Sequence, residues 1–218
     1  MTGFTRSPKL IKAGLVLISP ETGSIERIIS LQYNSETLTR SLAVQAVGGQ
    51  GERSHALRFK GPAIESFSLE AVLDATDQLQ FPDRNRSAVD AGLFPQIAAL
   101  EALVQPTSAQ LRFQDALASS GTLEIAPMEA PLTLFIWSRH RIVPVRISEL
   151  SITEEAFDPN LNPIRAKVSL SLRALSVDDL GFAHRGGGLF MAYLAAKEQL
   201  AVRSPGTTLS TFGVGSLP

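Results

Sequence analysis

The sequence contains no cysteine among its 218 residues. A chain without thiols cannot build a disulfide framework, hold a metal through cysteine, or use a thiol as a nucleophile. The absence also fits a reducing compartment, and we expect a cytoplasmic location.

An excess of charge of either sign is also missing. The 20 lysine and arginine residues nearly balance the 21 aspartate and glutamate residues, and the formal net charge is −1. The basic residues around Arg139 and Arg141 are too few, and too poor in interleaved aromatic residues, to form a nucleic-acid groove. We therefore expect neither nucleic acid nor an anionic membrane as a partner.

Long apolar runs are missing as well. Basic residues precede the apolar residues 13–18, as in a signal peptide, but Pro20 and Glu21 follow almost at once. Residues 13–18 are therefore predicted to form a buried strand. No other run approaches the roughly 20 apolar residues that cross a bilayer, so we expect a soluble protein.

Familiar catalytic and metal-binding patterns do not occur. The three histidines, His55, His140 and His184, include no pair at metal-ligand spacing. The sequence has no His-Glu-x-x-His motif and no Gly-x-Ser-x-Gly motif. We predict no catalytic, cofactor-binding or metal-binding residues, and no cofactor.

Some weaker motifs have simpler explanations. The glycines of residues 48–51 do not follow a strand-to-helix pattern, whereas residues 185–188 open a helix, where an anion could bind or the glycines could form a flexible connector. Residues 158–163 carry oxygen ligands, but their prolines and asparagines favour a tight turn over a calcium site. Glu154 and Glu155 are neighbours in a predicted strand, so they point to opposite faces and do not form a pair of acids.

What the sequence does contain is period-two alternation of apolar and polar residues, which is typical of half-buried strands. It is clearest in residues 164–173 and recurs in residues 66–74 and 29–33. Between Val143 and Glu154 the apolar phase changes, which indicates a bulge or a strand that leaves one sheet for another.

Two short runs, residues 15–18 and 132–137, are apolar on both faces. One interpretation is a central strand that its own chain covers on both sides. The other is that one face becomes buried only on assembly, and the two can hold together.

Helical spacing appears twice. An interposed helix is predicted from one apolar stripe that Pro106 ends, and a C-terminal helix over about 189–202 from another. The stripes are Leu93, Ile97, Leu100 and Val104, and Leu189, Tyr193, Ala196 and Leu200, the second flanked by Phe190 and Leu194. Residues 47–53 and 81–86 are predicted to be mobile loops, and the tail after Arg203 is predicted to be loose. We predict an α+β, mainly β fold of packed or curled antiparallel sheets with one interposed helix and one C-terminal helix.

Residues 29–38 resemble the opening motif of contractile injection system tube proteins. These are relatives of phage tail tube and baseplate-hub proteins and often occur beside a peptidoglycan-binding LysM module. The motif is an apolar-aromatic strand, then Asn-Pro, then a polar turn ending in Leu. Residues 61–74, residues 131–153 and residues 156–166 resemble further segments in the family's order, and the likeness extends over roughly residues 8–175. Ser35 replaces the expected proline, Ser138 stands where glycine often follows the tryptophan, and no LysM repeat follows Leu175, so wall binding is not implied.

The resemblance implies a tail-tube-like β domain over residues 1–176, followed by a connector, helix and flexible tail over residues 177–218. It implies a hub adaptor that forms a ring of six copies and joins the inner tube to the spike, with other baseplate proteins as partners and no cofactor. The extra C-terminal helix favours the adaptor over the alternative of a repeating inner-tube subunit. A β-rich enzyme or ligand-binding module with a dispersed site is a further alternative, and it predicts a deep pocket.

The apolar pattern predicts two contacts between chains. Copies should associate through strand edges or through the Phe135/Trp137 side of the two-sided strand. The C-terminal helix should dock on a partner or a neighbouring copy, with packing on its own sheet as the alternative. The ring's position, its copy number and the face that lines the lumen are left open.

Overall fold

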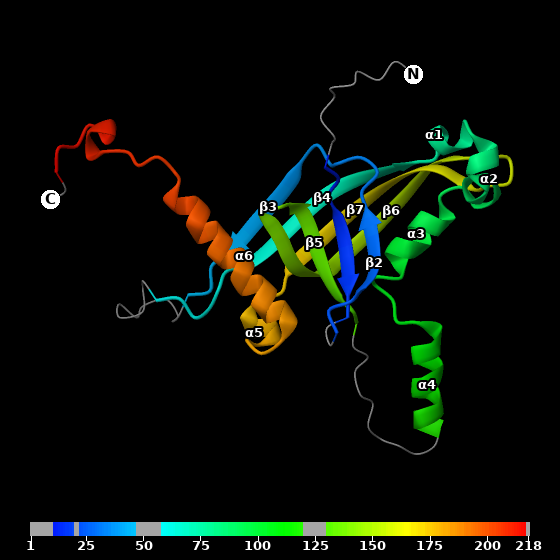
Figure 1. Ribbon diagram of the computed structural model, residues 1–218, viewed down its shortest axis with the longest axis horizontal. Coiled ribbons are helices and arrows are strands. Elements are labelled where there is room, and N and C mark those ends of the chain that lie inside the picture. The colour runs from blue at the N-terminus through cyan, green and yellow to red at the C-terminus, as the bar shows by residue number, and fades with distance from the viewer. Residues whose placement is uncertain (1–10, 20–21, 47–57, 120–129, 217–218) are drawn as a thin grey trace.

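The computed structural model describes residues 11–19, 22–46, 58–119 and 130–216. The predicted α+β, mainly β fold is confirmed, with a single curled sheet rather than two packed ones (Figure 1). The sheet has seven antiparallel strands in the order β2-β1-β5-β6-β7-β4-β3. The strands are β1 (Gly14–Ile18), β2 (Ile25–Ser30), β3 (Leu38–Ala43), β4 (Ile64–Asp74), β5 (Leu132–Ser138), β6 (Arg141–Phe157) and β7 (Pro163–Ala174).

Strands β2 and β3 follow each other in the chain but occupy opposite edges of the sheet, and residues 31–37 link them. In a flat sheet of this width the two edges would lie about 29 Å apart, at roughly 4.8 Å per strand. A link of this length reaches that far only when it is almost fully extended, at about 3.3 Å per residue. The link contains bends instead, so the sheet has to curl to bring its edges within reach.

Two polar side chains anchor this link to the sheet. Gln32 pairs with the backbone of Asp74: its Nε2 donates to the carbonyl oxygen at 2.6 Å and its Oε1 accepts from the amide at 2.8 Å. Asn34 accepts a hydrogen bond from the amide of Ala13 at 2.9 Å and donates one to the carbonyl of Ile11 at 2.8 Å. These residues belong to the segment that resembles the tube-protein motif, and their polar character therefore has a structural reason.

The main core lies on the concave face of the sheet, here called the inner face. The strand register aligns Phe67 of β4 with Leu172 of β7, and Phe135 of β5 with Val143 of β6, all of them buried. Alternation along each strand then places every second residue in the same core. Burying this many large apolar side chains, at about 1.5–3 kcal/mol each, supplies the main stabilisation of the sheet.

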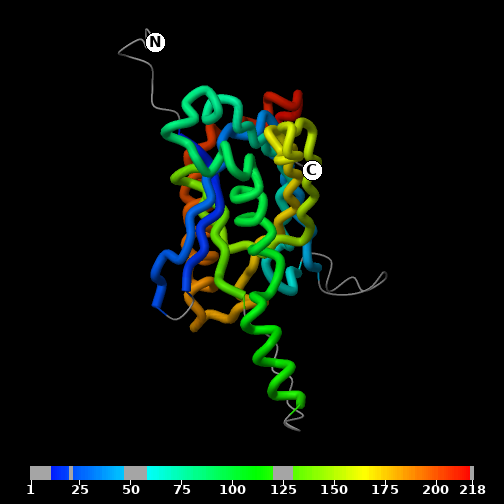
Figure 2. The backbone as a smooth tube through the Cα atoms, turned by 90° about the vertical axis from the view of Figure 1, so that its right-hand side faces the viewer, coloured from blue at the N-terminus to red at the C-terminus, as the bar shows by residue number. Residues whose placement is uncertain are grey.

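Helices fill the connection between β4 and β5 and follow β7. They are α1 (Thr76–Leu79), η2 (Pro82–Arg84), α2 (Arg86–Ala91), α3 (Phe94–Glu101), α4 (Ser108–Ser119), α5 (Val177–Leu180), α6 (Arg185–Val202) and η3 (Leu209–Phe212). The predicted stripe corresponds to α3, whose Ile97 and Leu100 are buried in the main core together with Leu93. Figure 2 shows α3 between the strands β1 and β2 on one side and the β6–β7 turn on the other.

The expectation of one interposed helix was incomplete. Helix α4 was missed because its apolar residues do not form a buried stripe, and none of its residues is buried. Residues 81–86 are ordered rather than a mobile loop, since the Asn85 side chain donates to the carbonyls of Gln78 and Phe81 at 3.0 and 3.1 Å. The predicted loop at 47–53 lies outside the described residues.

The two-sided apolar strands are covered by their own chain. Ile18, Leu132 and Leu134 form a second buried cluster on the outer face of β1 and β5. Leu180 of α5 and Leu189 of α6 pack against it. The interpretation that the chain itself covers both faces of these apolar runs is therefore confirmed for this cluster.

Strand β6 changes its apolar phase by a bulge. The register with β7 shifts between Ile147 and Glu149 and again between Glu154 and Phe157. At the first shift the Ser148 hydroxyl donates to the carbonyl of Ser171 at 2.9 Å. The strand stays in one sheet, so the bulge is confirmed.

The C-terminal helix begins earlier than predicted and packs on its own domain. Helix α6 starts at Arg185, and residues 186–188 form its first turn rather than a flexible connector. Phe190 and Tyr193 are buried, and Tyr193 belongs to the main core. The expectation that the helix docks on a partner instead of its own core is therefore wrong for its first half.

The second half of α6 extends beyond the sheet (Figure 1). Leu200 and Val202 are 39% and 86% exposed, and residues 203–216 are exposed throughout. Of the helices in the described ranges, none has the length and apolar character needed to span a membrane.

Candidate assembly surfaces

Among the residues that the structure describes, each of the edge strands β2 and β3 pairs with a neighbouring strand on one side only. In β2 and β3 nearly every residue is exposed, including Ile25 and Ile28 of β2 and Leu42 of β3. An edge strand presents unpaired N–H and C=O groups, and apolar side chains on it make pairing with another strand favourable. The two edges are therefore the first candidate surface for contact between copies.

The other predicted contact surface is not free. Phe135 is 1% exposed, and its ring lies 5.4 Å from that of Phe67 and 6.0 Å from that of Trp137. Trp137 itself packs partly buried against the main core. The expectation that the Phe135/Trp137 side joins copies is therefore wrong, because this side faces the inside of its own domain.

A buried carboxylate joins α6 to the sheet. Glu65 of β4 is 2% exposed and accepts a hydrogen bond from the Tyr193 hydroxyl at 2.9 Å. The Lys197 ammonium lies 3.0 Å from the second carboxylate oxygen, and the Arg40 guanidinium of β3 lies 3.6 Å from the first. These four residues, here called the Glu65 cluster, connect one edge strand, its neighbour and the C-terminal helix.

In the Glu65 cluster, the Tyr193 hydroxyl is the hydrogen-bond donor and the Glu65 carboxylate is the acceptor. Burial and the hydrogen bond to Glu65 raise the pKa of Tyr193 to about 12, because both disfavour the phenolate. The Lys197 ammonium lies 4.5 Å from the centre of the Tyr193 ring, so it also makes a cation–π contact. A buried carboxylate is tolerated here because it accepts hydrogen bonds from Tyr193 and Lys197 and lies close to the Arg40 guanidinium.

Sequence reasoning missed this cluster. The signal was available: Glu65 has the same parity as Phe67 and Leu69 in an alternating strand, so a charged residue stood at a core position. The partners Arg40 and Lys197 come from distant segments, and the sequence did not show that they would meet.

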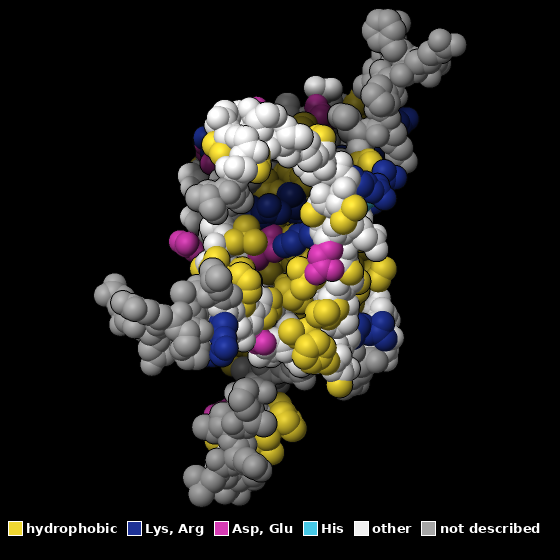
Figure 3. Space-filling view, turned by 90° about the vertical axis from the view of Figure 1, so that its left-hand side faces the viewer, with side chains coloured by type: hydrophobic (Ala, Val, Ile, Leu, Met, Phe, Trp, Pro, Cys, Tyr) yellow, Lys and Arg dark blue, Asp and Glu magenta, His cyan; other side chains and the backbone are white. Residues whose placement is uncertain are grey.

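Figure 3 shows the end of the molecule at which α6 and the C-terminal segment lie. This end is hollowed, and basic and acidic side chains gather in the hollow among apolar ones. The domain therefore presents a mixed, uneven surface at this end, in contrast to the regular strands along its side.

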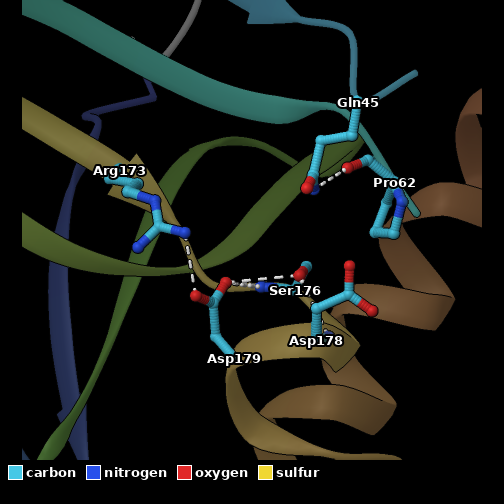
Figure 4. Close-up of polar contacts among 6 residues, drawn as sticks. All are labelled: Gln45, Pro62, Arg173, Ser176, Asp178 and Asp179. Carbon is cyan, nitrogen blue, oxygen red and sulfur yellow. Dashed lines mark hydrogen bonds and ion pairs between the residues drawn. The ribbon is translucent and has the colours of Figure 1, made fainter. Parts of the chain in front are cut away.

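The start of α5 is closed by a capping box (Figure 4). The Asp179 carboxylate accepts from the Ser176 amide at 2.9 Å and pairs with the Arg173 guanidinium at 2.8 Å. Asp178 points from the other side of Ser176 toward Pro62. The small cavity beside these residues has a volume of about 90 Å³, far below the roughly 300 Å³ at which ligand pockets begin.

The histidines that the structure describes lie in different elements. In the β5–β6 turn, His140 accepts a hydrogen bond from Arg139 Nε at 2.8 Å. His184 caps α6, and its Nδ1 accepts from the Gly186 amide at 3.1 Å. His55 lies outside the described residues, as do the glycines of residues 48–51. Within the described ranges, no group of three or more histidine and carboxylate side chains could hold a metal ion.

The glycines at the start of α6 are explained by close packing. A β-carbon on Gly187 would overlap the carbonyl oxygen of Gly181, and one on Gly186 would meet the Leu180 side chain. The Gly186 amide already has His184 as its partner. These contacts favour tight packing of α6 on α5 over an anion site.

The structure also places residues 158–163 and the neighbouring acids Glu154 and Glu155. Residues 158–163 form the tight β6–β7 turn, in which Asp158 accepts from the amides of Asn160 and Asn162 at 2.7 and 2.8 Å. The Asn162 side chain is the main cause of a lowered pKa at Asp158. Glu155 pairs with Lys167 at 2.6 Å on the outer face, whereas Glu154 stands opposite Ala166 of the inner face.

The exposed edge strands of this curled sheet are surfaces at which another chain could add a strand. The comparison with protein families agrees: the model of the family described as contractile injection system tube protein matches residues 9–181, and the chain belongs to this family. It is thus a tube-type structural protein of contractile injection systems.

Two solved structures are similar to the chain. One is the tail of an empty gene transfer agent particle with C6 symmetry, at 13% identity, a TM-score of 0.29, and coverage of 75% of this chain and 90% of that one. The other is the virion of a native gene transfer agent particle, at 12% identity, a TM-score of 0.26, and coverage of 74% and 90%. No curated protein matches the chain.

Proposed function

We propose that six copies of this protein form a ring at the baseplate hub of a contractile injection particle, where the ring joins the inner tube to the spike. The ring would contact the inner tube, the spike and other baseplate proteins, and it would assemble in the cytoplasm without a cofactor.

The observation that carries the proposal is the pair of open edges. Strands β2 and β3 are both six residues long, and they stand at opposite ends of one sheet. The β2 edge of one copy can therefore pair along its full length with the β3 edge of the next. Such a contact joins two different surfaces, and it closes into a ring when the rotation between copies divides the circle evenly.

The projections from the sheet support a place at a junction. Helix α4 and the second half of α6 extend away from the body of the domain (Figures 1 and 2). We propose that residues 177–218 form a connector whose exposed end, including Val202 and Phe212, contacts the neighbouring layer. The β domain would then end near residue 176, with α5 and the first half of α6 packed back onto it.

The repeating inner-tube subunit is the second candidate, and the family's description as a tube protein favours it. An electron-microscopy map of the particle separates the two. A single ring of this chain between tube and spike supports the adaptor, and a stack of such rings along the tube supports the repeating subunit. One copy per particle, outside any ring, contradicts both.

An enzyme or ligand-binding module with a dispersed site is the candidate from another class. It predicted a deep pocket, whereas the cavity beside α5 holds about 90 Å³. The description of the matching family as a tube protein supports the structural candidates instead.

A further inference from the structure

The end of the molecule at which α6 lies carries positive charge that its own carboxylate does not balance. This end is hollowed, and basic side chains gather in the hollow (Figure 3). Arg40 and Lys197 share the single carboxylate of Glu65, at 3.6 and 3.0 Å. A third cation, Arg141 at the start of β6, acts electrostatically on Tyr193 of the same cluster. These three cations are here called the basic site.

Arg141 has no carboxylate of its own. Its position has the same parity as the buried Val143 and Val145, so its side chain starts on the inner face, where the main core with Tyr193 also lies. Burial and the hydrogen bond to Glu65 raise the pKa of Tyr193, and the positive charges of Arg40 and Arg141 oppose that rise, so both guanidinium groups lie near the phenol. Within the described residues, the Arg141 side chain forms no hydrogen bond and no ion pair.

The cations of the basic site are accessible, whereas the carboxylate is enclosed. The side chains of Arg40 and Lys197 are 39% and 30% exposed, and that of Glu65 only 3%. Arg141 is half-buried. Glu198, next to Lys197, is exposed and forms no ion pair with these cations in the part of the chain that the structure describes. A hollow with low-dielectric walls concentrates the field of the charges that line it, so an approaching anion meets a positive potential.

Exposed leucines flank the basic site. Leu42 of β3 stands opposite Glu65 in the strand register, so the two side chains share the inner face. Leu200 follows Lys197 by three residues, which makes them neighbours on the surface of α6. Both leucines are exposed. A ligand that combines carboxylates with apolar groups can use all of these contacts, whereas a small free anion has only charges that salt screens.

The arrangement favours a protein segment over a nucleic acid. A nucleic acid gains its affinity from a series of cations that neutralise successive phosphates, and here three cations gather around one carboxylate. Arginine is also enriched in protein interfaces, and its planar fork gives paired hydrogen bonds to a carboxylate.

We propose that the basic site binds an acidic segment of a partner protein. A carboxylate of that segment is held by Arg141 and by the exposed sides of Arg40 and Lys197, and its apolar neighbours cover Leu42 and Leu200. The site lies within one copy of the chain, so the inference goes beyond the proposed ring and does not depend on it.

Binding is tested first with the full chain in solution. The probe is a short fluorescein-labelled peptide of glutamate, leucine and serine, and its matched control has glutamine in place of every glutamate. Fluorescence anisotropy should show that the acidic peptide binds, that sodium chloride weakens its binding, and that the glutamine peptide binds far less. Equal affinity for the two peptides, or binding of neither, overturns the proposal.

Variants then locate the binding on the molecule. Arg141→Gln should lower the affinity for the acidic peptide by about tenfold, because it removes a charged hydrogen-bond donor, and Arg141→Lys should retain part of the affinity. Arg112→Gln removes the same charge from the exposed helix α4 and should leave the affinity unchanged. Equal losses at Arg141 and Arg112 overturn the assignment. If Arg141→Gln does not fold, the comparison of Arg141→Lys with the parent and the comparison of the two peptides decide.

Assembled particles provide the partner. A photoreactive benzoylphenylalanine in place of Leu200 should crosslink to a partner segment that contains aspartate or glutamate, as mass spectrometry of the crosslinked peptides shows. Replacing those carboxylates with amides should abolish the crosslink. A crosslink to a segment without carboxylates, or no crosslink, overturns the proposal, whether or not a map of the particle shows the ring.

Discussion

The hydroxyl of Tyr193 donates a 2.9 Å hydrogen bond to the buried carboxylate of Glu65, and this contact fixes helix α6 across the end of the sheet. It joins residues that are 128 positions apart. The fold therefore depends on a polar contact where the sequence pattern suggested apolar packing alone.

Tyr193→Phe keeps the ring but removes the hydroxyl. The Glu65 carboxylate then loses one donor while it remains buried, so the free energy of unfolding should fall by about 1–3 kcal/mol. Urea denaturation measures the change. Tyr33→Phe is the matched control at a residue that is 49% exposed, and its effect should stay within about 0.5 kcal/mol. Equal effects at the two sites contradict the assignment of Tyr193 as a donor that α6 needs.

Glu65→Gln removes the charge that Tyr193, Lys197 and Arg40 share. We expect a loss of about 2 kcal/mol, reduced from the value for fully buried pairs because Lys197 and Arg40 are partly exposed. The double variant with Tyr193→Phe should lose less than the sum of the two single losses, because the residues act on one contact. Glu198→Gln, an exposed neighbour on α6, serves as the control. Full additivity argues against a shared cluster.

Alkaline pH should weaken the same contact. The pKa of Tyr193 lies at about 12 against an ordinary value of 10.0, so the folded protein holds the phenol proton more tightly than the unfolded chain. This stabilisation is complete below pH 10 and is lost as the pH rises toward 12. The chain has two tyrosines, so phenolate absorbance in a Tyr33→Phe variant reports on Tyr193 alone. Titration of that variant near pH 10 means that the hydrogen bond does not form.

The β6–β7 turn holds Leu161 in a left-handed conformation, with φ at 65°. This conformation is costly for leucine and well tolerated by asparagine. Leu161→Asn should raise the free energy of unfolding by about 0.5–1 kcal/mol, since the side chain is 74% exposed and loses little packing. Leu161→Val, with its branched β-carbon, should lower it. Thermal unfolding of both variants checks the order, and the reverse order contradicts it.

Assembly should be sensitive to charge on the open edge. Ile28→Lys introduces a cation on β2 at a side chain that is 64% exposed, and a lysine on an edge strand opposes pairing with another strand. We expect the variant to fold with an unfolding free energy within about 0.5 kcal/mol of the parent and to fail to enter rings. Ile11→Lys, at a residue that is 78% exposed and outside any strand, should assemble normally. Normal rings from Ile28→Lys would show that β2 does not join the copies.

The sequence predicted those parts of the fold whose pattern is local. Strands with strict alternation, such as β7, and the apolar stripe of α3 follow from residue spacing alone. Helix α4 was missed although Ala109, Phe113 and Ala116 recur in it at helical spacing, because that stripe does not lead into a core. The Glu65 cluster was missed because its members meet only in the folded chain. The Phe135/Trp137 side was misassigned because alternation shows that a face is apolar, not whether the same chain covers it.

The short link of residues 31–37 has a mechanical consequence for the proposed ring. A ring under outward pressure carries its load as tension around the circumference, and each copy passes that tension from one edge to the other. The hydrogen bonds between the strands share this load with the covalent link of residues 31–37. The side chains of Gln32 and Asn34 hold this link against the sheet on either side of its bend. Each subunit is thus a closed loop that resists being pulled open, and under excess load the joints between copies should part before any subunit unravels.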